Sequence, residues 1–263
     1  MSGMELTLRE HKNALIFDSN HELNKEPLRA DLLVIRKSSN ERIHKTIADI
    51  FRTHNIWEYK GFGDELNIDT LSKLIAYTAL YKSQGTTVDA IPFSEITASI
   101  CRYEYPRKLF EDLRRLGVTI DQKHPGIYSV TGLAYFPMQI VILKELEKHE
   151  YPELTMLSRG VTMEDFQTFM KQTFPDQGDK NNASALADVV LSGNPELLQK
   201  LKEDDEMHKA VEEFLKPTID ERIDKNTLEH LKNIMDRFKV SSQEAMDTLH
   251  IPPAEQNKYA SRL

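Results

Sequence analysis

The sequence has a single cysteine, Cys101, and no apolar run long enough to span a bilayer. One cysteine excludes an intramolecular disulfide and a paired-cysteine metal or redox site, so we expect a reducing, cytoplasmic setting. The longest nearly continuous apolar stretch, FPMQIVIL at 136–143, falls far short of the roughly 20 residues of a membrane-spanning helix. The N-terminal MSGMELTLREHKN is polar and lacks the apolar segment of a signal peptide. We therefore expect a soluble protein with no membrane partner.

Motifs of several common enzyme classes are also missing. The chain has no GxxxxGK[ST] phosphate loop, no GxGxxG dinucleotide fingerprint, no GxSxG nucleophile motif and no HExxH zinc motif. None of the nine histidines pairs with another at metal-ligand spacing, and the lone GxG at 61–63 is typical of a turn after a strand. The missing fingerprint, with no second α/β lobe, argues against a dehydrogenase.

Negative charge is concentrated in the C-terminal part of the chain. The net charge is −8, and residues 161–263 carry 13 Lys and Arg against 20 Asp and Glu, whereas the first 160 residues carry 21 against 22. Because phosphate binding needs clustered cations, we expect any DNA contact in the N-terminal part. The basic side chains between 28 and 60 are Arg29, Arg36, Lys37, Arg42, Lys45, Arg52 and Lys60. Taken alone, such a cluster is more typical of a solvated face.

The hydrophobic pattern divides the chain into a mixed region and a helical region. Strand patterns occur at ADLLVI, NIWEYKG, SEITASICRYEYP and GIYSV, and helical spacing occurs over 40–51, 67–85 and 106–117. From about residue 161 the apolar residues follow helical spacing, with almost no strand signal. We therefore predict an α/β domain over 1–158 and a helical region over 159–263.

Three ionisable residues stand at or within predicted strands. Asp31 opens the apolar strand LLVI, while alternation puts Glu58 and Lys60 on one face of NIWEYKG, together with Ile56. Burial of these charges is costly unless something compensates, and a divalent cation would do so. Carboxylate and carbonyl oxygens suit Mg²⁺ or Mn²⁺, and a neighbouring lysine suits phosphodiester hydrolysis. The alternative is that Asp31 caps a strand edge and Glu58 forms an exposed ion pair with Lys60.

The order of these elements resembles the PD-(D/E)xK nuclease superfamily: a helix, a hairpin with Asp in its second strand, a strand with Glu-x-Lys, a helix and a strand. The stretches EPLRADLLVIRK, IFRTHNIWEYKG and YTALYKS, with the tail LKNIMDRFKVSSQEAMDTLHIPPAEQNKYASRL, are similar to its recombination-promoting nuclease and transposase-like branch, common in gut bacteria. The resemblance implies an α/β fold with a restriction-endonuclease-like mixed sheet flanked by helices, followed by an all-helical C-terminal region.

The resemblance also implies residue roles. Asp31, Glu58 and the carbonyl of Tyr59 would ligate Mg²⁺ or Mn²⁺, and Lys60 would position or activate the attacking water. The catalytic residues would be Asp31, Glu58 and Lys60.

A glutamate of the first helix would complete the site in this family, and it corresponds to either Glu5 or Glu10. The expected function is a cytoplasmic, metal-dependent DNA endonuclease active in DNA recombination. Such an enzyme would bind DNA through its N-terminal core, and its acidic C-terminal helices could self-associate. The alternative is an inactive nuclease fold that acts as a nucleic-acid-binding or protein-interaction module.

Overall fold

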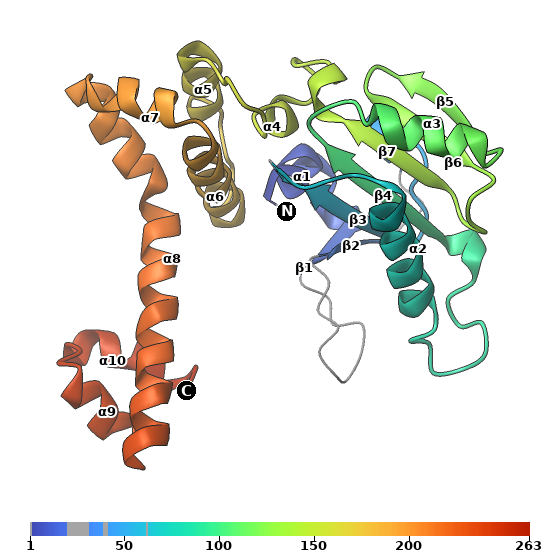
Figure 1. Ribbon diagram of the computed structural model, residues 1–263. Coiled ribbons are helices and arrows are strands. Elements are labelled where there is room, and N and C mark those ends of the chain that lie inside the picture. Colours follow the sequence, from blue (N-terminus) through green and yellow to red (C-terminus); the bar gives the residue numbers. More distant parts are fainter. Residues whose placement is uncertain (1, 20–31, 39–41, 62) are drawn as a thin grey trace. The chain divides into compact units, whose positions relative to one another are not determined.

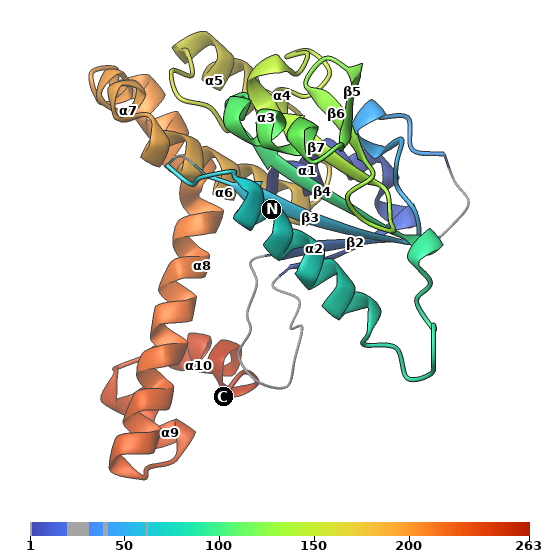
Figure 2. The same ribbon diagram turned by 45° about the vertical axis from the view of Figure 1, so that its right-hand side comes forward.

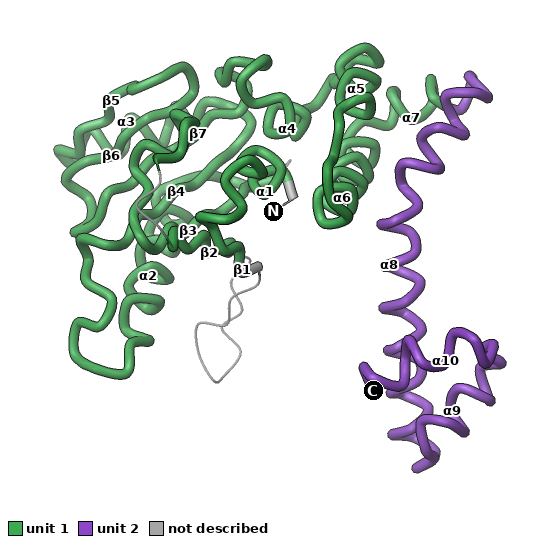
Figure 3. Tube along the Cα trace, turned by 180° about the vertical axis from the view of Figure 1, so that it is seen from behind, with its two compact units in different colours: residues 1–201 green, residues 202–263 purple. Residues whose placement is uncertain are grey.

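The structure is a computed structural model, and it describes residues 2–19, 32–38, 42–61 and 63–263. The chain forms two compact units, residues 1–201 and residues 202–263, shown in different colours in Figure 3. The sheet lies in the first unit, and the second unit is helical. The coarse prediction of a mixed α/β protein with a helical C-terminal region is therefore confirmed.

Seven strands form one mixed sheet in the described part of the chain, in the order β1-β2-β3-β4-β7-β6-β5. The parallel pairs are β3 with β4 and β4 with β7, and all other neighbours are antiparallel. The strands are β1 (Leu15–Ser19), β2 (Leu32–Lys37), β3 (His54–Lys60), β4 (Ile96–Arg102), β5 (Thr119–His124), β6 (Ile127–Thr131) and β7 (Met138–Ile142).

Helices cover both faces of this sheet. Figures 1 and 2 show α2 (Ile68–Lys82) and α3 (Arg107–Arg115) over one face, and Figure 3 shows α1 (Ser2–Thr7) on the other. The predicted helix at 67–85 is confirmed, and Asn67 begins it by accepting hydrogen bonds from the amides of Asp69 and Thr70. The apolar side of α2 is then fixed against the strands.

The core under α2 and α3 is built from alternate strand residues. Ile56 of β3, Ala98 of β4 and Ile140 of β7 share one cluster with Leu71 of α2 and Phe110 of α3, all at most 1% exposed. Because side chains alternate across a strand, Glu58 and Lys60 follow Ile56 on this same face. The core therefore defines the face on which the candidate site lies.

On the opposite face of the sheet, one predicted helix is not found among the described residues. Residues 40–51 were expected to be helical, but the described part of this segment has only a short 3-10 turn, Thr46–Ala48. The amide of Ile47 donates to the Tyr151 hydroxyl at 3.0 Å, and its carbonyl accepts from Gln139 at 2.9 Å. Side chains thus take up the backbone groups that a helix would have paired internally.

Short helices complete the first unit. Ion pairs tie the N-terminal segment to two of them: Arg9 contacts Glu153 of α4, and Lys12 lies 2.5 Å from the fully buried Asp179 of α6. The helices that complete this unit are α4 (Pro152–Thr155), α5 (Met163–Met170), α6 (Gln177–Gly193) and α7 (Pro195–Lys202), with 3-10 turns at Arg9–Ala14, Phe93–Glu95 and Leu143–Glu145. Helices α5 and α6 follow residue 158 yet belong to the unit that contains the sheet.

The second unit has a small apolar core of its own. Leu231 of α8 (Asp205–Phe238) packs in one cluster with Met246 of α9 (Ser242–Thr248) and Tyr259 of α10 (Pro253–Ala260). Ser241 and Glu244 form a reciprocal cap at the start of α9. Among the described residues, no helix combines the length and the apolar character needed to cross a membrane.

Candidate functional site

The structure brings Glu58 and Lys60 together near the carboxyl end of β3. Their side chains form an ion pair between Oε1 of Glu58 and Nζ of Lys60. The pair lies on the α2 side of the sheet, in line with Ile56, as strand alternation requires. Only 11% of the Glu58 side chain and 21% of the Lys60 side chain are exposed, so the pair is more buried than a surface ion pair.

The second carboxylate oxygen of Glu58 is the unusual atom of this pair. Oε2 is buried, and it has no hydrogen-bond partner among the residues that the structure describes. A buried acceptor without a donor costs roughly 1–3 kcal/mol, and more when it is charged. A cation or a donor from a bound molecule would remove that cost.

Strand β2 supplies the backbone next to Glu58. Leu32 is the register partner of Glu58 in the antiparallel pair of β2 and β3. The predicted ligand Asp31 lies outside the described residues, but it directly precedes Leu32 in the sequence. The pairing of Leu32 with Glu58 therefore gives the Asp31 prediction its structural context without placing its side chain.

Tyr59 lies between the two charged residues, in β3. Burial, with smaller effects of Cys101 and Asp64, raises the pKa of the Tyr59 phenol to about 12. The phenol therefore stays protonated at neutral pH and cannot serve there as a base. Of the two oxygens of Tyr59, the carbonyl named in the ligand prediction is the one suited to a cation.

A turn ends β3 immediately after Lys60, as the GxG at 61–63 predicts. The amide of Gly61 donates to a carboxylate oxygen of Asp64 at 2.9 Å. Gly63 has a φ of +92°, a conformation that favours glycine. This turn leads to α2 and fixes where the strand bearing Glu58 and Lys60 ends.

The two first-helix candidates lie in different environments. Glu5 belongs to α1 and is half-buried, whereas Glu10 is exposed in the 3-10 turn that follows. Within the described ranges, no three His, Cys, Asp or Glu side chains lie close enough together to hold a metal ion. The predicted ligand set includes Asp31, which those ranges leave out.

Arg102 was not among the predicted site residues, although it neighbours Lys60 in the sheet. Arg102 ends β4 as the parallel register partner of Lys60. Arg102 follows Ile100 of the α2-side core, and Lys60 follows Ile56 and Glu58 on the same face, so two cations lie side by side at one end of the sheet. Alternation within 96–102 indicates the face of Arg102, but only the parallel register reveals its neighbour.

Comparison with family models, with curated proteins and with solved structures gives no match to this chain.

Proposed function

We propose that this protein is a metal-dependent DNA endonuclease that hydrolyses phosphodiester bonds at Glu58 and Lys60. One observation carries the proposal: Oε2 of the buried Glu58 has no hydrogen-bond partner among the described residues, although Lys60 pairs with the other oxygen. A carboxylate in that state is ready to accept a cation. The adjacent Lys60 and Arg102 are suited to the anionic phosphate of a substrate.

The topology supports the same proposal. The helices and strands follow the order α1-β1-β2-β3-α2-β4 along the chain. β1 pairs with β2 and β2 pairs with β3 in antiparallel orientation, whereas β3 and β4 are parallel. This is the order that the resemblance to PD-(D/E)xK nucleases implies, with Glu-x-Lys on the third strand. The assignment to the restriction-endonuclease-like fold remains part of the proposal.

The residues present fit a divalent cation. Glu58, the carbonyl of Tyr59 and Asp31 would hold Mg²⁺ or Mn²⁺, all through oxygen. The cation would neutralise negative charge that develops on the phosphate. Lys60 would hold the attacking water or a phosphate oxygen through its ammonium group, and Arg102 would bind an adjoining phosphate oxygen.

A cleavage assay tests the proposal. The purified protein should nick or cut plasmid DNA with Mg²⁺ or Mn²⁺ and should not do so in excess chelator. Glu58→Ala and Lys60→Ala should each lower the rate by at least about 100-fold. An exposed lysine of the same unit provides a matched control, Lys123→Ala on β5, which should cleave at the wild-type rate. Equal cleavage by all four proteins would contradict the proposal.

A second function is favoured by the ion pair itself. Lys60 already neutralises one oxygen of Glu58 without any substrate, an arrangement that also suits an inactive nuclease fold kept for binding. In that case the protein would bind DNA or a protein partner without cleaving it. The two functions differ in one measurement, because only an intact metal site makes the melting temperature rise with Mg²⁺ or Mn²⁺.

A further inference from the structure

A pocket of about 600 Å³ lies in the first unit between the end of β7, α4 and α5. Its volume falls within the range of small-molecule sites, roughly 300–1,000 Å³. Tyr103, which follows β4, lines it, and the Tyr103 carbonyl accepts a hydrogen bond from the amide of Lys144. The pocket therefore opens beyond the carboxyl ends of the parallel strands, where ligands of open α/β sheets commonly bind.

The rim of this pocket is basic, although the chain as a whole is acidic. Lys144, Lys148 and Arg159 line it, with His149, against a single carboxylate from Asp165. Among the described residues no carboxylate forms an ion pair with Lys144, whose ammonium lies over the Tyr103 ring. This excess of positive charge favours an anionic ligand.

Asp165, the one carboxylate that lines the pocket, does not neutralise the positive charge of its basic side chains. Lys148 lies 3.2 Å from Asp165, but its side chain is 74% exposed, so the pair is weak and Lys148 can turn to a ligand. Burial alone would raise the pKa of Asp165, but hydrogen bonds from Thr162 and Lys148 outweigh it and lower the pKa. Asp165 is therefore ionised at neutral pH and pairs with Lys148, and the pocket is also lined by the cationic side chains of Lys144 and Arg159.

The loop that carries Arg159 is held in place. Asn194, which is only 6% exposed, accepts hydrogen bonds from the amides of Gly160 and Val161 and donates one to the carbonyl of Ser158. Gly160 has a φ of +76°, which favours glycine. Such a fixed loop lowers the entropic cost of binding a ligand.

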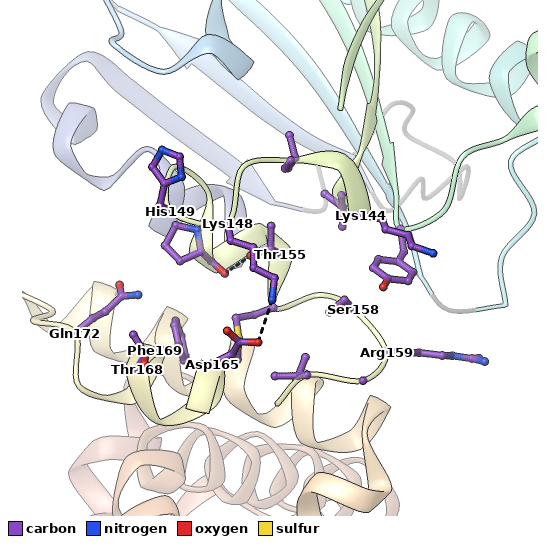
Figure 4. A pocket seen from close by; sticks show the side chains of 17 residues that line it. Lys144, Lys148, His149, Thr155, Ser158, Arg159, Asp165, Thr168, Phe169 and Gln172 are labelled. Carbon is purple, nitrogen blue, oxygen red and sulfur yellow. Dashed lines mark hydrogen bonds and ion pairs between the residues drawn. The ribbon is translucent and has the colours of Figure 1, made fainter. Parts of the chain in front are cut away.

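The other end of the pocket has a different chemistry. Its floor is apolar and includes Phe169 (Figure 4), which is 1% exposed. Gln172 also lines the pocket, and its amide oxygen is buried with no hydrogen-bond partner among the described residues. Figure 4 shows Lys144 and Arg159 toward one side of the view and Gln172 toward the other. An acceptor and an apolar surface thus lie apart from the cations.

We propose that this pocket binds a nucleotide unit, with its phosphate at Lys144 and Arg159 and its base on the apolar floor, where a base amino group or sugar hydroxyl donates to Gln172. A nucleotide combines these three features: an anion, a flat apolar ring and hydrogen-bond donors. The unit could belong to a DNA strand or be a free nucleotide, since both present the same groups. The proposal does not depend on hydrolysis at Glu58.

Calorimetric titration of the full chain in excess chelator tests this site apart from any metal-dependent cleavage. The probes are adenosine 5′-monophosphate, a 5′-phosphorylated single-stranded oligonucleotide and inorganic phosphate. Lys144→Glu should weaken binding of the nucleotide probes about tenfold or more, because it replaces a phosphate-binding cation with an anion. The matched control is Lys180→Glu, an exposed lysine outside the pocket, which should leave binding unchanged.

Gln172→Leu separates nucleotide recognition from simple anion binding. It should weaken adenosine monophosphate about fivefold and leave inorganic phosphate unaffected. Oligonucleotide binding without mononucleotide binding would assign the site to a nucleic-acid strand, and comparable binding of both would assign it to a free nucleotide. Absence of binding by both nucleotide probes, or equal binding by Lys144→Glu and Lys180→Glu, would overturn the proposal. Loss of DNA cleavage in Glu58→Ala with this binding intact would show that the two sites are independent.

Discussion

Each face of strand β3 carries a buried polar side chain, and the two side chains differ in how fully they are hydrogen-bonded. On the face away from α2, Asn55 is 1% exposed, and its amide donates to the carbonyls of Ile35 and Arg52 at 3.0 and 2.7 Å. Its oxygen accepts from the Arg52 amide and the Thr97 hydroxyl, both at 2.8 Å. On the α2 face, Glu58 is 8% exposed, and one of its oxygens has no such partner among the described residues.

This difference separates a structural residue from a candidate functional one. Asn55 uses all of its hydrogen-bonding capacity within the protein, so its burial is compensated and it fixes the segment before β3. Glu58 keeps unused capacity in a buried place, which a protein retains at a cost in stability. We therefore expect Asn55 to matter for folding and Glu58 to matter for binding.

The largest expected effect on stability comes from Asn55→Leu. The substitution removes four hydrogen bonds and leaves buried partners unpaired, so unfolding free energy should fall by about 3–5 kcal/mol. Urea denaturation measures it. An exposed asparagine, Asn226→Leu on α8, serves as the control and should change stability by less than about 1 kcal/mol. A small effect of Asn55→Leu would contradict the structural role of Asn55.

Metal ions should give the next largest effect. Saturating Mg²⁺ or Mn²⁺ should stabilise the wild-type protein by about 1–3 kcal/mol, because the ion binds only the folded site. Glu58→Gln keeps the shape of the side chain but removes its charge, and it should lose most of this stabilisation. Thermal unfolding with and without the ion measures the effect. Identical shifts in both proteins would show that the ion binds elsewhere.

Without metal, Glu58→Leu should leave stability unchanged or raise it by up to about 2 kcal/mol. The variant removes an unpaired buried oxygen, and Lys60 is exposed enough to reach water. Urea denaturation in chelator compares it with wild type. Destabilisation by more than about 2 kcal/mol would make Glu58 a structural residue like Asn55.

The smallest effect concerns His54, the first residue of β3. Its Nδ1 lies 2.7 Å from the Tyr81 hydroxyl, and burial, aided by Arg36, lowers its pKa. A lowered pKa means that the unfolded chain takes up the proton first, so stability falls as pH drops below about 6.5. His54→Gln should flatten this fall by less than about 1 kcal/mol between pH 7 and pH 5. An unchanged slope would assign the dependence to other groups.

Much of the architecture could be predicted from local patterns. The helical spacing over 67–85 identified α2, and alternation identified the shared face of Glu58 and Lys60. These features depend on neighbours in the sequence, which is why a single chain reveals them.

The failures have a different origin. The segment at 40–51 has helical spacing, but tertiary hydrogen bonds of Ile47 with Gln139 and Tyr151 hold its described part in an irregular form. The pairing of Lys60 with Arg102 and the pocket at Lys144 both require strand order, which no local pattern encodes. The role of Asp31 stays a prediction, since it lies outside the described residues.

The most direct test of the central claim is a crystal of the protein soaked in Mn²⁺, with the ion located by its anomalous scattering. We expect a single peak about 2 Å from Oε2 of Glu58, with Asp31 and the carbonyl of Tyr59 among its ligands. A well-ordered site without a peak at saturating Mn²⁺, or with Oε2 of Glu58 bonded to a protein donor instead, would contradict the account.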